Sequence, residues 1–159
     1  MNKVYFLLGS NIGKSEEQLR SAIIHIEKKV GKIVAASAIY QTEAWGKTDQ
    51  PDFLNQVVIA ETNLPAEETL SAILSIEEKM GRVRTEKNAP RIIDIDILFY
   101  NEAIIREPHF IVPHPEIQNR MFVLVPLNEL SPDYIHPFLH KTIHQLLKEC
   151  KDVLNVKKF

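Results

Sequence analysis

One stretch decides how this chain folds: KNAPRIIDIDIL, residues 87–98. Its repeated isoleucines are β-branched and predict a strand. Because side chains alternate along a strand, Asp94 and Asp96 should share one face, and the isoleucines around them should share the other. The stretch therefore predicts a strand that is apolar on one side and carries two neighbouring carboxylates on the other.

The carboxylate pair is best explained by a cation between the two acids. Side by side, they repel each other unless a positive charge intervenes. Their hard oxygen ligands suit Mg²⁺, which usually binds together with substrate phosphates. An Asp-x-Asp pair or a basic loop alone is more often ordinary surface, but here acids and bases are segregated within fifteen positions. The bases that precede the strand suggest chemistry on a polyphosphate: Arg82, Arg84, Lys87 and Arg91.

Composition limits the remaining possibilities. The chain has 159 residues, 45% of them hydrophobic, which fits a single domain over residues 1–159 with a real core. A net charge of −2 gives no bulk attraction to nucleic acid or to an anionic membrane. The single Cys150 excludes an internal disulfide. Without a secretory or membrane-spanning pattern, we expect a soluble, monomeric protein of the cytoplasm.

The order of predicted elements gives the fold class. Periodicity predicts a strand over 4–8, a helix from 15 to 30, strands over 33–40 and 53–61, a helix from 65 to 81, and the Asp-x-Asp strand. This βαββαβ order is typical of a ferredoxin-like α+β core, with an antiparallel-rich sheet and two helices on one face. Short helices over 120–130 and 141–148 form a C-terminal extension. The loops over 41–52 and 82–91 are longer than connection requires, so both are candidates for function.

Seven short motifs occur in an order and spacing that resemble one family. They are LGSN (8–11), YQTE (40–43), DQPDFLN (49–55), GRVR (81–84), APRIIDID (89–96), VPHP (112–115) and NRMFVL (119–124). Together they resemble 6-hydroxymethyl-7,8-dihydropterin pyrophosphokinase of folate biosynthesis. The resemblance implies that a pyrophosphoryl group passes from ATP to the pterin hydroxymethyl group, with release of AMP.

The resemblance also implies roles toward ATP and metal. Asp94 and Asp96 would hold two Mg²⁺ ions, and with Arg82 and Arg91 they make up the predicted catalytic set. The residues implied to contact ATP are Leu70, Glu77, Arg84, Arg91, Ile97, His114 and Arg120. The plainer alternative for Glu77 is a partly buried acid paired with a nearby base, and for Arg82 a solvated loop.

For the pterin, the resemblance points to a second group of residues. Asn55 can donate and accept hydrogen bonds at once, which matches an amino-pyrimidinone edge. Phe53 and Phe122 would stack on the flat ring, although ordinary core packing is the alternative for both. The other implied contacts are Thr42, Glu43 and Trp45. Asn88, Phe53 and Pro115 depart from residues common in the family.

Other readings of the sequence stay open at this point. A non-catalytic ferredoxin-like module could bind a nucleotide without needing paired acids, and a two-metal phosphodiesterase or nuclease would need more carboxylates and a basic surface. No Walker loop or Gly-x-Gly-x-x-Gly motif is present. His136, His140 and His144 have helical metal-ligand spacing, but Pro137 interrupts it, so we interpret them as surface histidines.

Overall fold

The structure is a computed structural model that describes residues 1–42, 51–81 and 92–159. Its largest sheet contains β1 (Asn2–Ser10), β2 (Gly31–Ala36), β3 (Tyr40–Thr42), β4 (Phe53–Thr62), β5 (Asp94–Tyr100) and β8 (Val156–Lys158). A small hairpin consists of β6 (Ile105–Glu107) and β7 (Phe110–Val112). The helices are α1 (Ser15–Lys29), α2 (Ala66–Lys79), α3 (Met121–Leu130) and α4 (Ile143–Glu149), with a 3-10 turn over Ile117–Asn119.

The strand order confirms the ferredoxin-like prediction. The main sheet runs β5-β1-β4-β3-β8, with β2 also paired to β4, and every pair within it is antiparallel. β1 and β4 are therefore the central strands, and β5 lies at one edge. The second strand of the βαββαβ order is divided between β2 and β3.

The division of that strand differs from the single strand predicted over 33–40. The Ser37 backbone N–H still donates to the Val57 carbonyl at 2.9 Å, but the Ser37 hydroxyl accepts the Val57 N–H at 3.0 Å. The next backbone N–H, of Ala38, donates to the Glu129 carboxylate on α3 at 3.1 Å. The chain therefore leaves the ladder for three residues and re-enters it as β3.

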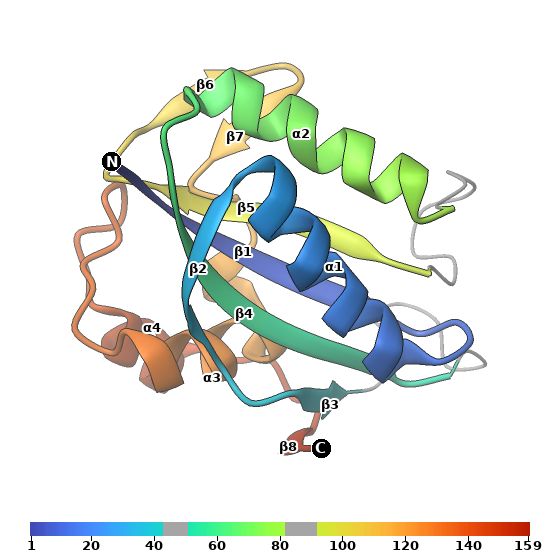
Figure 1. Ribbon diagram of the computed structural model, residues 1–159. Coiled ribbons are helices and arrows are strands. Elements are labelled where there is room, and N and C mark those ends of the chain that lie inside the picture. Colours follow the sequence, from blue (N-terminus) through green and yellow to red (C-terminus); the bar gives the residue numbers. More distant parts are fainter. Residues whose placement is uncertain (43–50, 82–91) are drawn as a thin grey trace.

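The sheet is covered on both faces, which the sequence predicted for one face only. α1 and α2 lie over one face, and α3 and α4 lie behind the other (Figure 1). β1 explains this arrangement, because its run from Val4 to Leu8 is apolar at every position. Phe6 and Leu8 belong to the core under α1 and α2, and Tyr5 and Leu7 belong to the core under α3 and α4.

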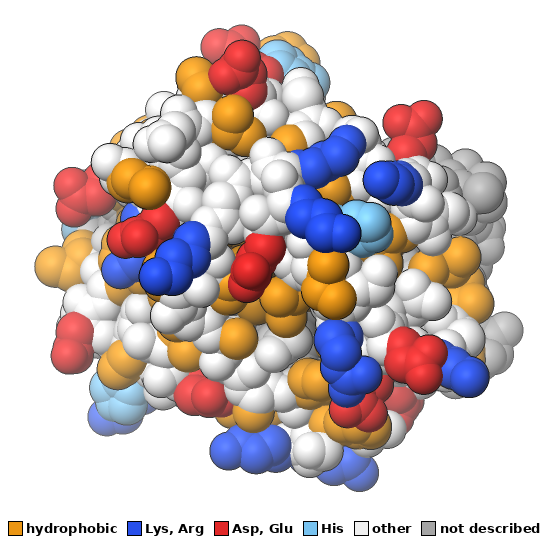
Figure 2. Space-filling view, in the orientation of Figure 1, with side chains coloured by type: hydrophobic (Ala, Val, Ile, Leu, Met, Phe, Trp, Pro, Cys, Tyr) orange, Lys and Arg blue, Asp and Glu red, His pale blue; other side chains and the backbone are white. Residues whose placement is uncertain are grey.

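Charges are interspersed over the face that α1 and α2 cover, with acidic and basic side chains side by side (Figure 2). α2 ends at Lys79, two residues before the predicted stop at Gly81, whose φ of +91° suits glycine. Among the described residues, no helix is long and apolar enough to cross a membrane.

The prediction that His136 is a surface histidine is wrong, although His140 and His144 are exposed. His136 is only 3% exposed and packs edge-on against Phe99, with ring centroids 5.5 Å apart. Its Nδ1 accepts the backbone N–H groups of Phe138 and Leu139. Burial lowers its pKa to about 4, so the ring is neutral at physiological pH.

Candidate active site

The Asp-x-Asp pair lies where the sequence predicted, on one face of edge strand β5. Asp94 and Asp96 are half-buried, and the intervening Ile95 and the following Ile97 are fully buried. Both isoleucines belong to the core under α1 and α2. The two carboxylates consequently extend from the opposite face, the one that α3 and α4 cover.

A row of paired residues runs across the sheet from the first carboxylate. Asp94 pairs with Gly9 on β1, Gly9 pairs with Asn55 on β4, and Asn55 pairs with Tyr40 on β3. Directly paired residues lie on the same face of a sheet. Asp94 and Asn55 therefore face the same side, separated only by a glycine that has no side chain.

Gly9 leaves the space that the Asn55 side chain occupies. A Cβ added at Gly9 would lie 3.0 Å from Asn55 Oδ1 and 3.9 Å from Phe53 Cδ1. Asn55 is only 3% exposed, and its Nδ2 has no hydrogen-bond partner among the described residues. A buried amide donor without a partner is costly, so a ligand acceptor at this position would be favoured.

Two more residues predicted to contact the pterin lie beside Asn55. Phe53 begins β4 and is half-buried, on the same face as Asn55 because it is two positions away. Thr42 pairs with Phe53 across the β3–β4 ladder and is buried. The Thr42 hydroxyl donates to the Asn155 carbonyl at 3.2 Å, which leaves its oxygen able to accept.

His114 is attached to the strand that carries the acids. It follows the cis Val112–Pro113 bond, and its backbone N–H donates to the Leu98 carbonyl of β5 at 3.0 Å. Its Nδ1 accepts the Glu116 backbone N–H at 3.1 Å, so in the neutral ring Nε2 carries the proton.

The electrostatics of His114 show which charges surround it. Burial lowers the pKa of His114, the positive charge of Arg120 lowers it further, and the negative charges of Asp94 and Glu116 oppose this shift. The ring is therefore neutral near pH 7 and can donate from Nε2. The His114 ring therefore lies close enough to Arg120 and Asp94 for both charges to act on its pKa.

The start of α3 brings in Arg120 and Phe122. Arg120 is the residue before the first turn, and its guanidinium lies 5.6 Å from the centre of the Phe122 ring. Phe122 is half-buried and packs against the core under α3 and α4. Both residues are thus presented to the face that carries Asp94 and Asn55.

Glu77, Leu70 and Ile97 lie on the other side of β5, with α2. Glu77 is buried, and its Oε2 accepts the Ile95 backbone N–H at 2.7 Å. Leu70 and Ile97 pack in the core under α1 and α2. Glu77 therefore anchors the open edge of the carboxylate strand, and contact of these three residues with ATP stays a prediction.

Five predicted site residues lie outside the described residues: Glu43, Trp45, Arg82, Arg84 and Arg91.

Sequence reasoning missed three features that support the site. Gly9 was noticed only within a motif, although a glycine that interrupts an apolar strand signals a close approach. Glu129 accepts the Tyr40 hydroxyl at 2.6 Å, and Asp152 accepts the Met121 N–H at 3.0 Å. Neither acid carries a sequence signal, because its partner is remote in the chain.

A metal ion needs several donor atoms around one point. The described part of the chain holds no group of three or more His, Cys, Asp or Glu side chains that could bind a metal. Two carboxylate oxygens on one face nevertheless fit Mg²⁺, which keeps waters and takes phosphate oxygens as further ligands. The fold and these residues define a class: a ferredoxin-like α+β protein whose sheet end suits a metal-bound phosphate compound.

Comparisons with known proteins identify the family. Residues 5–132 match the model of the 7,8-dihydro-6-hydroxymethylpterin-pyrophosphokinase family. The 2-amino-4-hydroxy-6-hydroxymethyldihydropteridine pyrophosphokinase of Methylorubrum extorquens is 43% identical over 136 residues, which cover 85% of this chain and 86% of that protein. The protein of the same name from Aquifex aeolicus is 40% identical over 159 residues, covering 100% of this chain and 96% of that protein.

Solved structures agree on the fold. The crystal structure of Plasmodium falciparum HPPK-DHPS aligns with a TM-score of 0.75 and 21% sequence identity over 94% of this chain. This chain spans 43% of that longer chain. The chain belongs to the 7,8-dihydro-6-hydroxymethylpterin-pyrophosphokinase family. Its members are transferases that move pyrophosphate from ATP to hydroxymethyldihydropterin in folate biosynthesis.

Proposed function

We propose that the described sheet end is the place where the pyrophosphoryl group of ATP passes to the hydroxymethyl group of 6-hydroxymethyl-7,8-dihydropterin. One observation carries this proposal: Asp94 and Asn55 face the same side across Gly9. Adjacent strands lie about 4.8 Å apart, so the two backbones are separated by roughly 10 Å. That spacing leaves room for one flat bicyclic ring between the amide and the acids.

The metal-binding part of the proposal rests on Asp94 and Asp96, which would hold two Mg²⁺ ions with the ATP phosphates. Bound there, Mg²⁺ would neutralise phosphate charge and lower the pKa of the pterin hydroxyl. The two side chains orient the phosphates from a strand whose backbone Glu77 secures at Ile95. We assign no general base, and the hydroxyl proton would leave to bulk water.

Phosphate binding would fall to donors that surround the acids. The neutral ring of His114 offers its Nε2–H, and Arg120 adds a positive charge in the same neighbourhood. Phosphoryl-type transfer depends mainly on alignment and charge neutralisation, which such donors supply. Arg82, Arg84 and Arg91 are predicted to join them.

The pterin would bind along β3 and β4. Asn55 would donate from its buried Nδ2 and accept at Oδ1 on the amino-pyrimidinone edge, and the Thr42 oxygen could accept the exocyclic amine. Phe53 and Phe122 would flank the ring by stacking. Glu43 and Trp45 are the remaining predicted contacts on this side.

The nucleoside part of ATP would extend over the β5 edge toward α2. The half-buried Leu70 offers apolar surface there, which suits a purine, and Ile97 lies buried in the same core. Glu77 holds the strand edge nearby at the Ile95 N–H. A monomeric state and a location in the cytoplasm are further predictions for this enzyme, which sedimentation and cell fractionation would measure.

The first experiment measures nucleotide products from ATP with Mg²⁺, with and without the pterin. AMP that forms only with the pterin supports the proposed reaction. ADP or phosphate as product would reject the transfer and favour a phosphatase or nuclease-like activity. ATP binding that ignores Mg²⁺ and gives no product would favour the non-catalytic module.

Two variants then test the map of the site. Asp94→Ala should abolish AMP formation and leave the fold intact, whereas near-normal turnover would contradict the metal assignment. Asn55→Ala should mainly weaken pterin binding. If the KM for ATP rose instead and the KM for the pterin held, the pterin pocket would lie elsewhere.

A further inference from the structure

The C-terminal segment passes the start of α3 and ends beside β3 (Figure 1). Asp152 contacts α3 through Oδ2, which accepts the Met121 N–H at 3.0 Å. Farther along, β8 pairs with β3, with Val156 opposite Thr42 and Lys158 opposite Tyr40. A few residues of chain thus touch β3 and α3, two of the three described elements that carry predicted pterin contacts.

The contact with α3 replaces a missing helix cap. Arg120 precedes the helix in an extended conformation and forms no side-chain capping hydrogen bond. The first N–H groups of a helix need outside acceptors, and a carboxylate is especially favourable there. Asp152 supplies one from a distant part of the chain. Arg120 and Phe122 flank Met121, so the position of this first turn sets the direction of both side chains.

The contact with β3 is made by the same short segment. The Asn155 carbonyl accepts the Thr42 hydroxyl at 3.2 Å, which fixes the orientation of that hydroxyl. Between the two contacts the chain is itself constrained, because Asp152 Oδ1 accepts the Leu154 N–H at 3.0 Å. Three residues of chain span at most about 11 Å, so the start of α3 and Thr42 are held at a limited separation.

We propose that the C-terminal segment is a positioning element of the site and that Asp152 is its positioning residue. Asp152 holds the first turn of α3 at a limited distance from Thr42. It thereby sets the positions of Arg120 and Phe122 relative to Thr42. This inference rests on the proposed function, because it concerns how Phe122 and Thr42 meet the pterin. Asp152 acts through backbone groups, the Met121 N–H of α3 and the Leu154 N–H of its own segment, and not through contact with the substrates.

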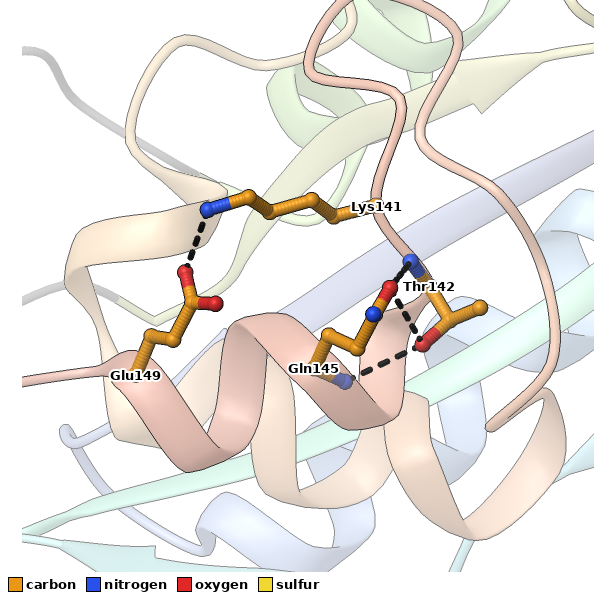
Figure 3. A network of polar contacts seen from close by, with 4 residues as sticks. All are labelled: Lys141, Thr142, Gln145 and Glu149. Carbon is orange, nitrogen blue, oxygen red and sulfur yellow. Dashed lines mark hydrogen bonds and ion pairs between the residues drawn. The ribbon is translucent and has the colours of Figure 1, made fainter.

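The test compares the loss of two helix caps. Asp152→Ala removes the acceptor at the start of α3. Thr142→Ala is the matched control, because it removes the cap of α4, where Thr142 and Gln145 hydrogen-bond each other's backbone (Figure 3). α4 carries no proposed site residue. Asp152→Asn keeps an oxygen that can accept the Met121 N–H and serves as the conservative variant.

We expect both alanine variants to lower the urea midpoint of unfolding by similar amounts. Only Asp152→Ala should raise the KM for the pterin, by roughly five- to tenfold, with a smaller rise for ATP. Asp152→Asn should stay within about threefold of the natural protein, because the acceptor remains. Unchanged KM values in Asp152→Ala, together with a lowered urea midpoint, would overturn the inference and leave Asp152 a purely structural residue.

A second readout separates this inference from the proposed reaction. Amide exchange and the ¹⁵N–¹H resonance of Met121 report the hydrogen bond without turnover. Loss of protection at Met121 in Asp152→Ala, but not in Thr142→Ala, supports the positioning role even if the reaction proves different. Full protection at Met121 in Asp152→Ala would overturn it, whatever the natural protein does with ATP.

Discussion

A methyl group added at Gly9 offers a selective test of the pterin pocket. In Gly9→Ala the new Cβ would lie 3.0 Å from Asn55 Oδ1, whereas ordinary contacts begin at 3.4 Å. Asn55 is buried beside Phe53, whose Cδ1 would lie 3.9 Å from the same Cβ, so the carboxamide has little room to retreat. The amide must therefore move by about 0.4 Å or rotate.

The size of the effect follows from the hydrogen bonds that Asn55 is proposed to make. Each is worth about 0.5–1.5 kcal/mol, and a displaced amide weakens both its donor and its acceptor. A combined loss of about 1–2 kcal/mol raises the KM for the pterin roughly 5- to 30-fold. The ATP side should change little, because Asp94 pairs with Gly9 only through the backbone ladder.

The assay is steady-state AMP formation with each substrate varied in turn, together with urea unfolding. Gly13→Ala is the control: nothing lies within 4 Å of its added Cβ, but its φ of +70° disfavours alanine. That variant should lose about 1 kcal/mol of stability and keep both KM values. An unchanged KM for the pterin in Gly9→Ala, or a rise for ATP alone, would refute the reasoning.

Three further predictions follow from other contacts. Asp96→Asn, like Asp94→Asn, should lower AMP formation at least about a hundredfold, with unfolding within about 0.5 kcal/mol of the natural protein; normal turnover would remove the metal site. Glu77→Ala removes the carboxylate oxygen that accepts the Ile95 N–H at 2.7 Å and should cost about 1.5–3 kcal/mol in urea unfolding, with Glu77→Gln costing less. His136 has a pKa lowered to about 4, so its neutral form is favoured by folding and its contribution is complete above the unfolded value of 6.5. Stability should fall by up to about 3 kcal/mol as the pH drops from 6.5 to 4, and His136→Phe should flatten this dependence; equal pH profiles of the two proteins would contradict it.

The sequence was informative wherever local pattern and tertiary environment agree. The alternation in β5 predicted both the strand and the shared face of Asp94 and Asp96, because one side of that strand is buried. The βαββαβ order followed from helix and strand periods that packing reinforces. α3 and α4 also formed within two residues of their predicted bounds.

Prediction failed where distant residues decide the local structure. The break at Ser37 depends on Val57 and Glu129, which lie far away in the chain. β8 is three residues long and exists because β3 offers an open edge. His136 is buried because its Nδ1 can accept two local N–H groups, which a pattern of spacing cannot reveal. Polar residues in these roles carry no periodic signal.

The same limit applies to the site. The proposed site residues came from a family resemblance, which did not reveal the property of β1 that lies between Asp94 and Asn55. A central strand normally projects side chains from both faces, yet at Gly9 it projects none, and the Asn55 amide fills that space. The acids on β5 and the amide on β4 then face the same side of the sheet with no β1 side chain between them, as the proposed site requires. A larger residue at this position would displace the Asn55 amide and leave the β5 carboxylates in place.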